Sequence, residues 1–61
     1  MRNIKLSFYG ISANSERAKL KLTENNIPFE AEKNGDINLP IPLNMTQKSF
    51  NELMDVVKEL L

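Results

Sequence analysis

Residues 37–45 read Ile-Asn-Leu-Pro-Ile-Pro-Leu-Asn-Met, and this stretch decides how a sheet can be built. Apolar side chains alternate with polar ones and prolines, which is typical of a strand with one buried face. Pro40 and Pro42 are two residues apart, so their missing N–H groups lie on the same edge of the strand. Because that edge cannot carry a regular hydrogen-bond ladder, we expect an edge strand here. Its buried face would consist of Ile37, Leu39, Ile41, Leu43 and Met45.

Two strand-like segments precede this one. Residues 4–9 (IKLSFY) alternate between apolar and polar side chains. Residues 29–33 (FEAEK) alternate as well, and we expect Phe29 and Ala31 to point inward. The next three residues, Asn-Gly-Asp, are typical of a tight turn. The segment 29–33 should therefore connect directly to 37–45.

A first helix is expected between these segments, from about residue 12 to Glu24. Ile11, Ala18 and Leu22 lie at helical spacing, and Ser15 and Asn25 complete this face. The polar run over 12–15 offers several N-cap side chains, and the two asparagines after Glu24 favour a helix end.

A second helix is the clearest element of the sequence. Ser49 and Glu52 form a capping-box pattern at its start. An apolar stripe at helical spacing follows, made of Phe50, Leu53, Met54, Val57, Leu60 and Leu61.

The order strand, helix, strand, strand, helix predicts an α+β fold. We expect one domain over residues 1–61, with a three-stranded mixed sheet and both helices on one face. A chain of 61 residues with no cysteine and no histidine has neither a disulfide nor the commonest metal ligands. It depends on packing or on a partner for its stability.

Composition excludes several function classes. The 8 basic and 8 acidic side chains cancel, which argues against binding of nucleic acid by phosphate neutralisation. No apolar run is long enough for a membrane span or a signal peptide, so we expect a cytoplasmic protein without membrane contact. Abundant asparagine and lysine are typical of AT-rich coding sequences, which suggests a bacterial or phage origin.

Few residues could carry chemistry. Ser15 and Lys19 are one helical turn apart, but a cap followed by a solvated lysine explains them better than a nucleophile does. Glu30 and Glu32 could meet a cation, although a solvated strand face is the simpler interpretation. An anion at the start of the first helix competes with capping by the local side chains. We expect no enzyme activity, no cofactor and no metal.

Residues 4–30 resemble the beginning of the glutaredoxins and related thioredoxin-fold proteins. The shared order is the strand IKLSFYG, then SANSERAKLKLTENN, then IPFE. Ser12-Ala13-Asn14-Ser15 stands where that family has Cys-x-x-Cys, and Leu39-Pro40 resembles its Val-Pro, whose proline is cis. The helix between the second and third strands, the fourth strand and a Gly-Gly-Asp turn of the family are missing. The resemblance implies a reduced thioredoxin-like fold.

Serine at both cysteine positions removes the chemistry that the resemblance would otherwise imply, because thiol–disulfide exchange needs a thiolate. We therefore expect a non-catalytic binding module that engages a protein partner, and a regulator encoded by a phage or mobile element is one such protein. The inherited recognition surface would consist of Ser12, Asn14, Ser15, Leu39 and Pro40. The alternative is a small structural protein that forms a homo-oligomer through its C-terminal helix. A glutathione-binding protein or enzyme ranks third.

Overall fold

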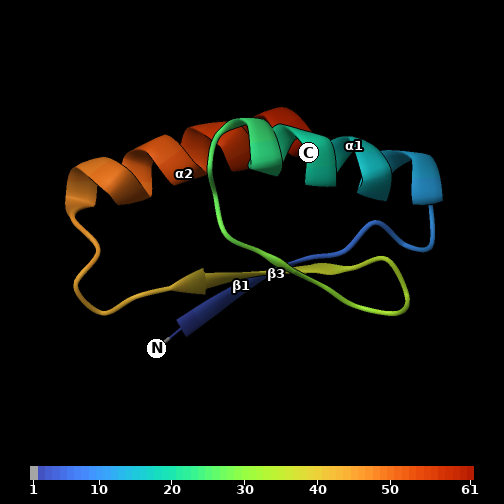
Figure 1. Ribbon diagram of the computed structural model, residues 1–61, viewed down its shortest axis with the longest axis horizontal. Coiled ribbons are helices and arrows are strands. Elements are labelled where there is room, and N and C mark those ends of the chain that lie inside the picture. The colour runs from blue at the N-terminus through green and yellow to red at the C-terminus, as the bar shows by residue number, and fades with distance from the viewer. Residues whose placement is uncertain (1) are drawn as a thin grey trace.

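Two helices lie side by side on one face of a three-stranded sheet (Figure 1). The computed structural model describes residues 2–61. The elements follow the predicted order, and the α+β class is confirmed. They are β1 (Arg2–Leu6), α1 (Ser12–Glu24), β2 (Glu30–Ala31), β3 (Ile37–Ile41) and α2 (Gln47–Leu60).

The sheet has the order β1-β3-β2, and both pairs of neighbours are antiparallel. β1 and β2 therefore run parallel to each other with β3 between them, which is a split β-α-β arrangement. The predicted mixed sheet is wrong, because the two parallel strands are not neighbours. The predicted edge position of residues 37–45 is wrong as well, since β3 is the middle strand.

The direction in which Pro40 faces explains this error. The N–H of Glu32 donates to the carbonyl of Asp36 at 2.8 Å. The backbone N–H and C=O groups of even-numbered residues in this strand therefore point toward β2, and those of odd-numbered residues point toward β1. β1 pairs with the whole of Ile37–Ile41 through the edge that keeps its N–H groups. β2 pairs only as far as Asn38 and stops before Pro40. The proline edge therefore shortens a neighbouring strand but does not exclude one.

Both outer strands are shorter than the alternation of side chains predicts. β1 ends at Leu6, before Tyr9, and the backbone then turns with positive φ at Tyr9 (52°) and Gly10 (77°). β2 covers only Glu30–Ala31 of the predicted 29–33. Ala31 was expected to point inward but is exposed, because this two-residue strand lies at the margin of the sheet, and no strand within residues 2–61 lies beyond it.

α1 has the predicted bounds, and Ser15, Ala18 and Leu22 form its buried face. Ile11 and Asn25, which were expected on the same face, are exposed because they are the cap residues just outside the helix. The predicted side-chain cap is absent from its first turn: the N-cap residue is Ile11, and no side chain accepts a hydrogen bond there. The helix ends as expected, with Asn26 in the left-handed conformation (φ 57°).

α2 begins at Gln47, earlier than the capping-box pattern predicts. Its N-cap is Thr46, whose Oγ1 accepts a hydrogen bond from the N–H of Ser49 at 3.1 Å. The interpretation of Ser49 as the cap is therefore wrong, because Thr46 already satisfies this free N–H. The predicted apolar stripe contributes Leu53, Val57 and Leu60 to the core, whereas Leu61 is exposed.

The core lies between the helices and the sheet. The buried apolar side chains are Leu6, Phe8, Ala18, Leu22, Ile37, Leu39, Leu53, Val57 and Leu60. The predicted buried face of 37–45 does not continue to Leu43, which is exposed. The reason is a turn after β3, in which the N–H of Met45 donates to the carbonyl of Pro42 at 3.2 Å.

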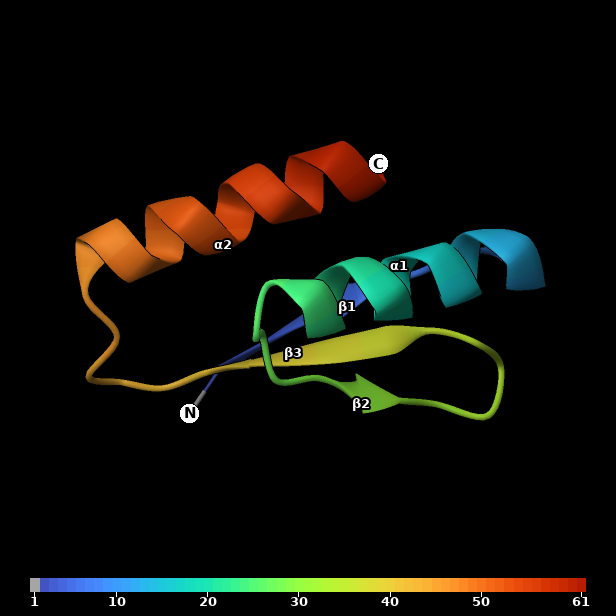
Figure 2. The same cartoon turned by 45° about the horizontal axis from the view of Figure 1, so that its top comes forward.

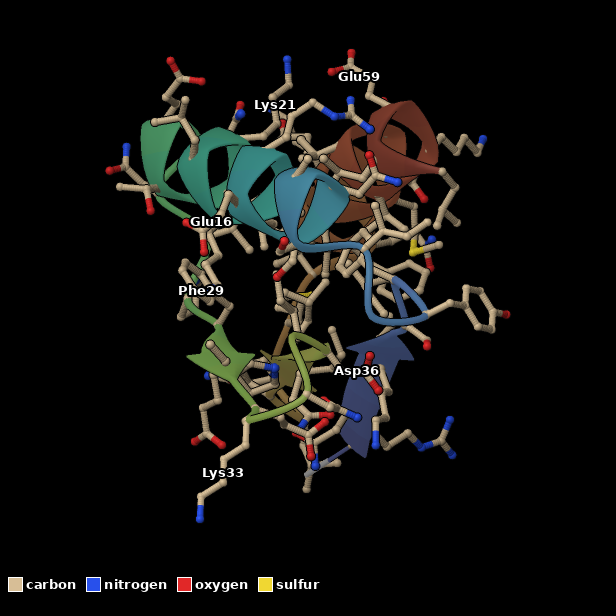
Figure 3. The ribbon with its side chains drawn as sticks, turned by 90° about the vertical axis from the view of Figure 1, so that its right-hand side faces the viewer. Glu16, Lys21, Phe29, Lys33, Asp36 and Glu59 are labelled. Atoms are coloured by element: carbon tan, nitrogen blue, oxygen red, sulfur yellow. The ribbon has the colours of Figure 1, made fainter. Side chains whose placement is uncertain are left out.

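Each helix covers one half of the same face of the sheet. α2 lies above β1, and α1 lies above β2 (Figure 3), an arrangement that is also visible in the tilted view of Figure 2. The opposite face of the sheet is covered by no helix of residues 2–61 and carries polar side chains, among them Asn3, Lys5 and Asn38.

Candidate functional site

The structure separates the five predicted site residues, because three lie at the start of α1, Pro40 lies near the other end of that helix, and Leu39 is buried in the core. Ser12 and Ser15 line a pocket at the start of α1, beside the turn of residues 34–36, and Asn14 lies in the same helical turn, exposed. Pro40 lines a different pocket, next to the residues that follow α1. Leu39 has no exposed surface. The Leu39–Pro40 peptide bond is trans, since residues 2–61 contain no cis peptide bond.

The pocket at the start of α1 is small and polar, with a volume of about 240 Å³. The Ser15 hydroxyl donates to the carbonyl of Gly35 at 2.7 Å. The Lys19 ammonium donates to Glu16 at 3.1 Å. The groups of a serine–lysine pair are therefore each bonded elsewhere. Glu16 and Glu32 also line this pocket together with Lys19 and Lys33, so its lining has no surplus of positive charge for an anion.

A charged cluster on the open face of the sheet joins β1 to the β2–β3 turn. The Lys5 ammonium lies 3.2 Å from a carboxylate oxygen of Glu32 and 3.8 Å from one of Asp36. The Asp36 backbone N–H donates to Asn34 Oδ1 at 3.0 Å, and Asn34 Nδ2 donates back to the Asp36 carboxylate at 3.1 Å (Figure 3). This cluster holds the turn in place. Glu32 thus pairs with a lysine, and among residues 2–61 no three acidic side chains are grouped as metal ligands.

A larger, more apolar opening lies at the end of the sheet that β2 does not reach. It has a volume of about 400 Å³. We call it the proline groove, after the three prolines in its wall. Its apolar wall consists of Ile27, Pro28, Pro40, Pro42, Met45, Leu53 and Val56, and its polar rim of Asn25, Asn26, Ser49 and Glu52.

Three elements position the groove. α1 ends at Glu24, and the chain leaves it through Asn25 and Asn26 toward Pro28. The second wall is the end of β3, where Pro40 has stopped the pairing of β2. The third is the α1-facing flank of α2, where Val56 lies. The groove therefore exists because the proline edge of β3 leaves the sheet two strands wide at this end.

The rim of the groove carries a negative charge. Pro28, Pro40 and Pro42 in its wall have no N–H to donate, and the carbonyl of Pro42 already accepts from the N–H of Met45. The Asn25 side-chain amide already donates to the Lys21 carbonyl at 2.9 Å. Glu52 is exposed, and among the described residues that line the groove it is the one with a charged side chain. The site therefore suits an apolar group that carries hydrogen-bond donors or a positive charge.

Sequence reasoning found Pro40 but missed the rest of the groove. The signal that was available is the pair Pro40 and Pro42, because both remove a donor from the same edge of the 37–45 segment. Val56 also pointed to it, since it widens the apolar stripe of α2 beyond what a single sheet face covers.

No helix among the described residues is long and apolar enough to cross a membrane. No family model, no curated protein and no solved structure matches the chain.

Proposed function

We propose that this chain is a non-catalytic protein-binding module whose proline groove receives a segment of another protein. The observation that carries the proposal is the apolar groove of about 400 Å³ with an acidic rim, formed where β2 stops short. Apolar clefts of this size with a few polar groups at their edge are the usual form of binding sites.

The partner segment has a definite chemistry. Its anchor is a large apolar side chain that fills the space between Pro40, Met45 and Val56. Beside the anchor it carries lysine or arginine, because the rim offers the Glu52 carboxylate. The basic residue supplies specificity, and the apolar anchor supplies most of the affinity.

The resemblance to the glutaredoxins remains a proposal about ancestry. The succession of β1, α1 and β2, with α1 starting at Ser12, supports it. The sheet order β1-β3-β2 adds no support. On this view the binding surface has shifted from the serine positions at the start of α1 to the opposite end of that helix, and Pro40 is the residue that the predicted surface and the groove share.

Selection from a random peptide library against the immobilised chain tests the proposal. We expect enriched sequences that pair a large apolar residue with lysine or arginine. Glu52→Gln should remove the basic preference, because it keeps the shape of the side chain and deletes its charge. Asp55→Asn is the matched control, since Asp55 is an exposed residue of α2 outside the groove.

An enriched peptide is then added to the isotopically labelled chain. The Met45 and Val56 methyl resonances should shift on binding. The proposal is wrong if no sequence is enriched, if Glu52→Gln and Asp55→Asn select the same peptides as the unaltered chain, or if the shifts lie away from the groove.

A further inference from the structure

A second surface lies on the other side of α2, where β1 forms an open edge of the sheet. Odd-numbered residues of β3 face β1, so Ile4, which is registered with Leu39, turns its backbone groups toward β3. The neighbouring residues Asn3 and Lys5 then turn theirs outward. Their N–H and C=O groups have no strand beside them among residues 2–61.

An uncovered apolar flank of α2 overhangs this edge. Successive helical residues are 100° apart, so Phe50, Met54 and Leu61 lie on the flank opposite Glu52 and Ser49. Phe50 and Met54 are half-buried, and Leu61 is 83% exposed. α2 lies above β1 with α1 on its other side (Figure 3). The flank opposite Glu52 faces away from α1 and therefore lies toward the outer edge of β1. The outer edge of β1 thus combines backbone groups without partners and an apolar flank of α2 above them, which is a surface that a fourth strand can occupy.

The charges at the edge of β1 indicate which charge the added strand should carry. Lys5 projects to the open face and is paired with Glu32 and Asp36. Arg2 lies on the helix side of the sheet, in register with Ile41, and forms no ion pair among residues 2–61. A strand added here meets an unpaired guanidinium at the beginning of β1.

A second copy of this chain does not fit. Pairing β1 with a second β1 would place two α2 helices above adjacent strands, which are about 4.8 Å apart. Packed helices need about 8–10 Å between their axes. A strand without its own covering helix avoids this overlap.

We propose that the β1 edge binds an extended segment of a partner protein as a fourth, antiparallel strand. Alternate side chains of this segment are apolar and pack against Ile4, Met54 and Phe50. An acidic side chain follows at its C-terminal end and pairs with Arg2. The helix-side residues of the segment thus read apolar, apolar, acidic at every second position, and the backbone bonds are made to Asn3 and Lys5.

Amide hydrogen exchange with a synthetic peptide tests the proposal. The peptide contains Val-Thr-Ile-Thr-Glu, and a matched peptide replaces its glutamate by lysine. We expect the first peptide to slow exchange at the Asn3 and Lys5 amides about tenfold or more, with the Ile4 amide as the internal reference that β3 already protects. The lysine peptide should bind more weakly, and Arg2→Glu should reverse that preference.

Asn3→Pro removes an outward N–H without affecting the ladder to β3, and Asn3→Ala is its control. We expect binding to weaken about tenfold in the proline variant only, with unchanged circular dichroism showing that the fold is intact.

The proposal is overturned if the Asn3 and Lys5 amides keep their exchange rates, if both Asn3 variants bind equally, or if α2 instead forms a homodimer that buries Met54. Because the groove residue Glu52 takes no part here, Glu52→Gln should leave this binding unchanged, so failure of either proposal is separable from failure of the other.

Discussion

Ser15 shows how a polar residue can belong to the core of a small domain. Only 3% of its surface is exposed, and its hydroxyl donates to the carbonyl of Gly35. Gly35 has φ +91°, a conformation that favours glycine, and its carbonyl points back to α1. The sequence placed this serine on the same helical face as Ala18 and Leu22 and also suggested a role as a helix cap. The structure gives it a tertiary role instead, as a connection between α1 and the β2–β3 turn.

Replacing Ser15 by alanine should therefore destabilise the fold. The change leaves the Gly35 carbonyl without its partner in a part-buried position, which costs about 1–2 kcal/mol in the free energy of unfolding. Urea denaturation followed by circular dichroism measures this cost. Ser12→Ala is the control, because Ser12 is exposed in the same helix turn. Equal stability of the two variants would show that the Ser15 hydrogen bond contributes nothing.

α2 is the element on which both proposed surfaces depend. One flank, with Val56 and Glu52, faces the proline groove, and Met54 and Leu61 lie on the opposite flank, which faces away from α1. Periodicity predicted the helix because its apolar residues recur at helical spacing. It could not predict which flank would be covered, since that depends on how β1 and α1 pack from distant parts of the chain. The first residue of α2 could not be predicted either, because Thr46 and Ser49 are both good N-caps by residue type.

α1 and α2 are also joined by an ion pair at their exposed side. The Lys21 ammonium lies 2.8 Å from the Glu59 carboxylate (Figure 3). The hydrogen bond to Glu59, together with its charge, raises the pKa of Lys21 above the ordinary 10.5. A raised pKa means that the stabilisation is complete below the ordinary value and is lost as the pH rises through the folded-state pKa. Because the pair is exposed to solvent, its contribution to stability is small.

Glu59→Gln should return the pKa of Lys21 toward its ordinary value. NMR titration of the Lys21 side chain at alkaline pH measures this change. Glu24→Gln is the comparison, because Glu24 raises the same pKa by a smaller effect. An unchanged Lys21 titration in Glu59→Gln would show that the two helices are not joined by this pair in solution.

At the scale of the whole molecule, the position of β3 determines the rest. With β3 in the middle, its proline edge shortens β2 and opens the groove, and β1 becomes a free edge. The order of elements, the bounds of α1 and the turn at residues 34–36 could be predicted, because each depends on local residue patterns. The strand order could not, since Pro40 restricts hydrogen bonding on one edge only and does not indicate how many residues a neighbour pairs before reaching it. The candidate site followed the same limit: Pro40 was identified, but Ile27, Met45 and Val56 meet it only through tertiary packing.

Cross-strand NMR contacts test the central position of β3 most directly. In this register Lys5–Asn38 and Asn3–Pro40 are the pairs that do not exchange hydrogen bonds, so their Cα atoms lie about 4.5 Å apart with the Hα atoms facing each other. We predict strong Hα–Hα nuclear Overhauser effects for both pairs. Contacts that join β1 directly to β2, such as Ile4 to Glu30, with none from β1 to β3, would contradict the sheet order and with it both proposed binding surfaces.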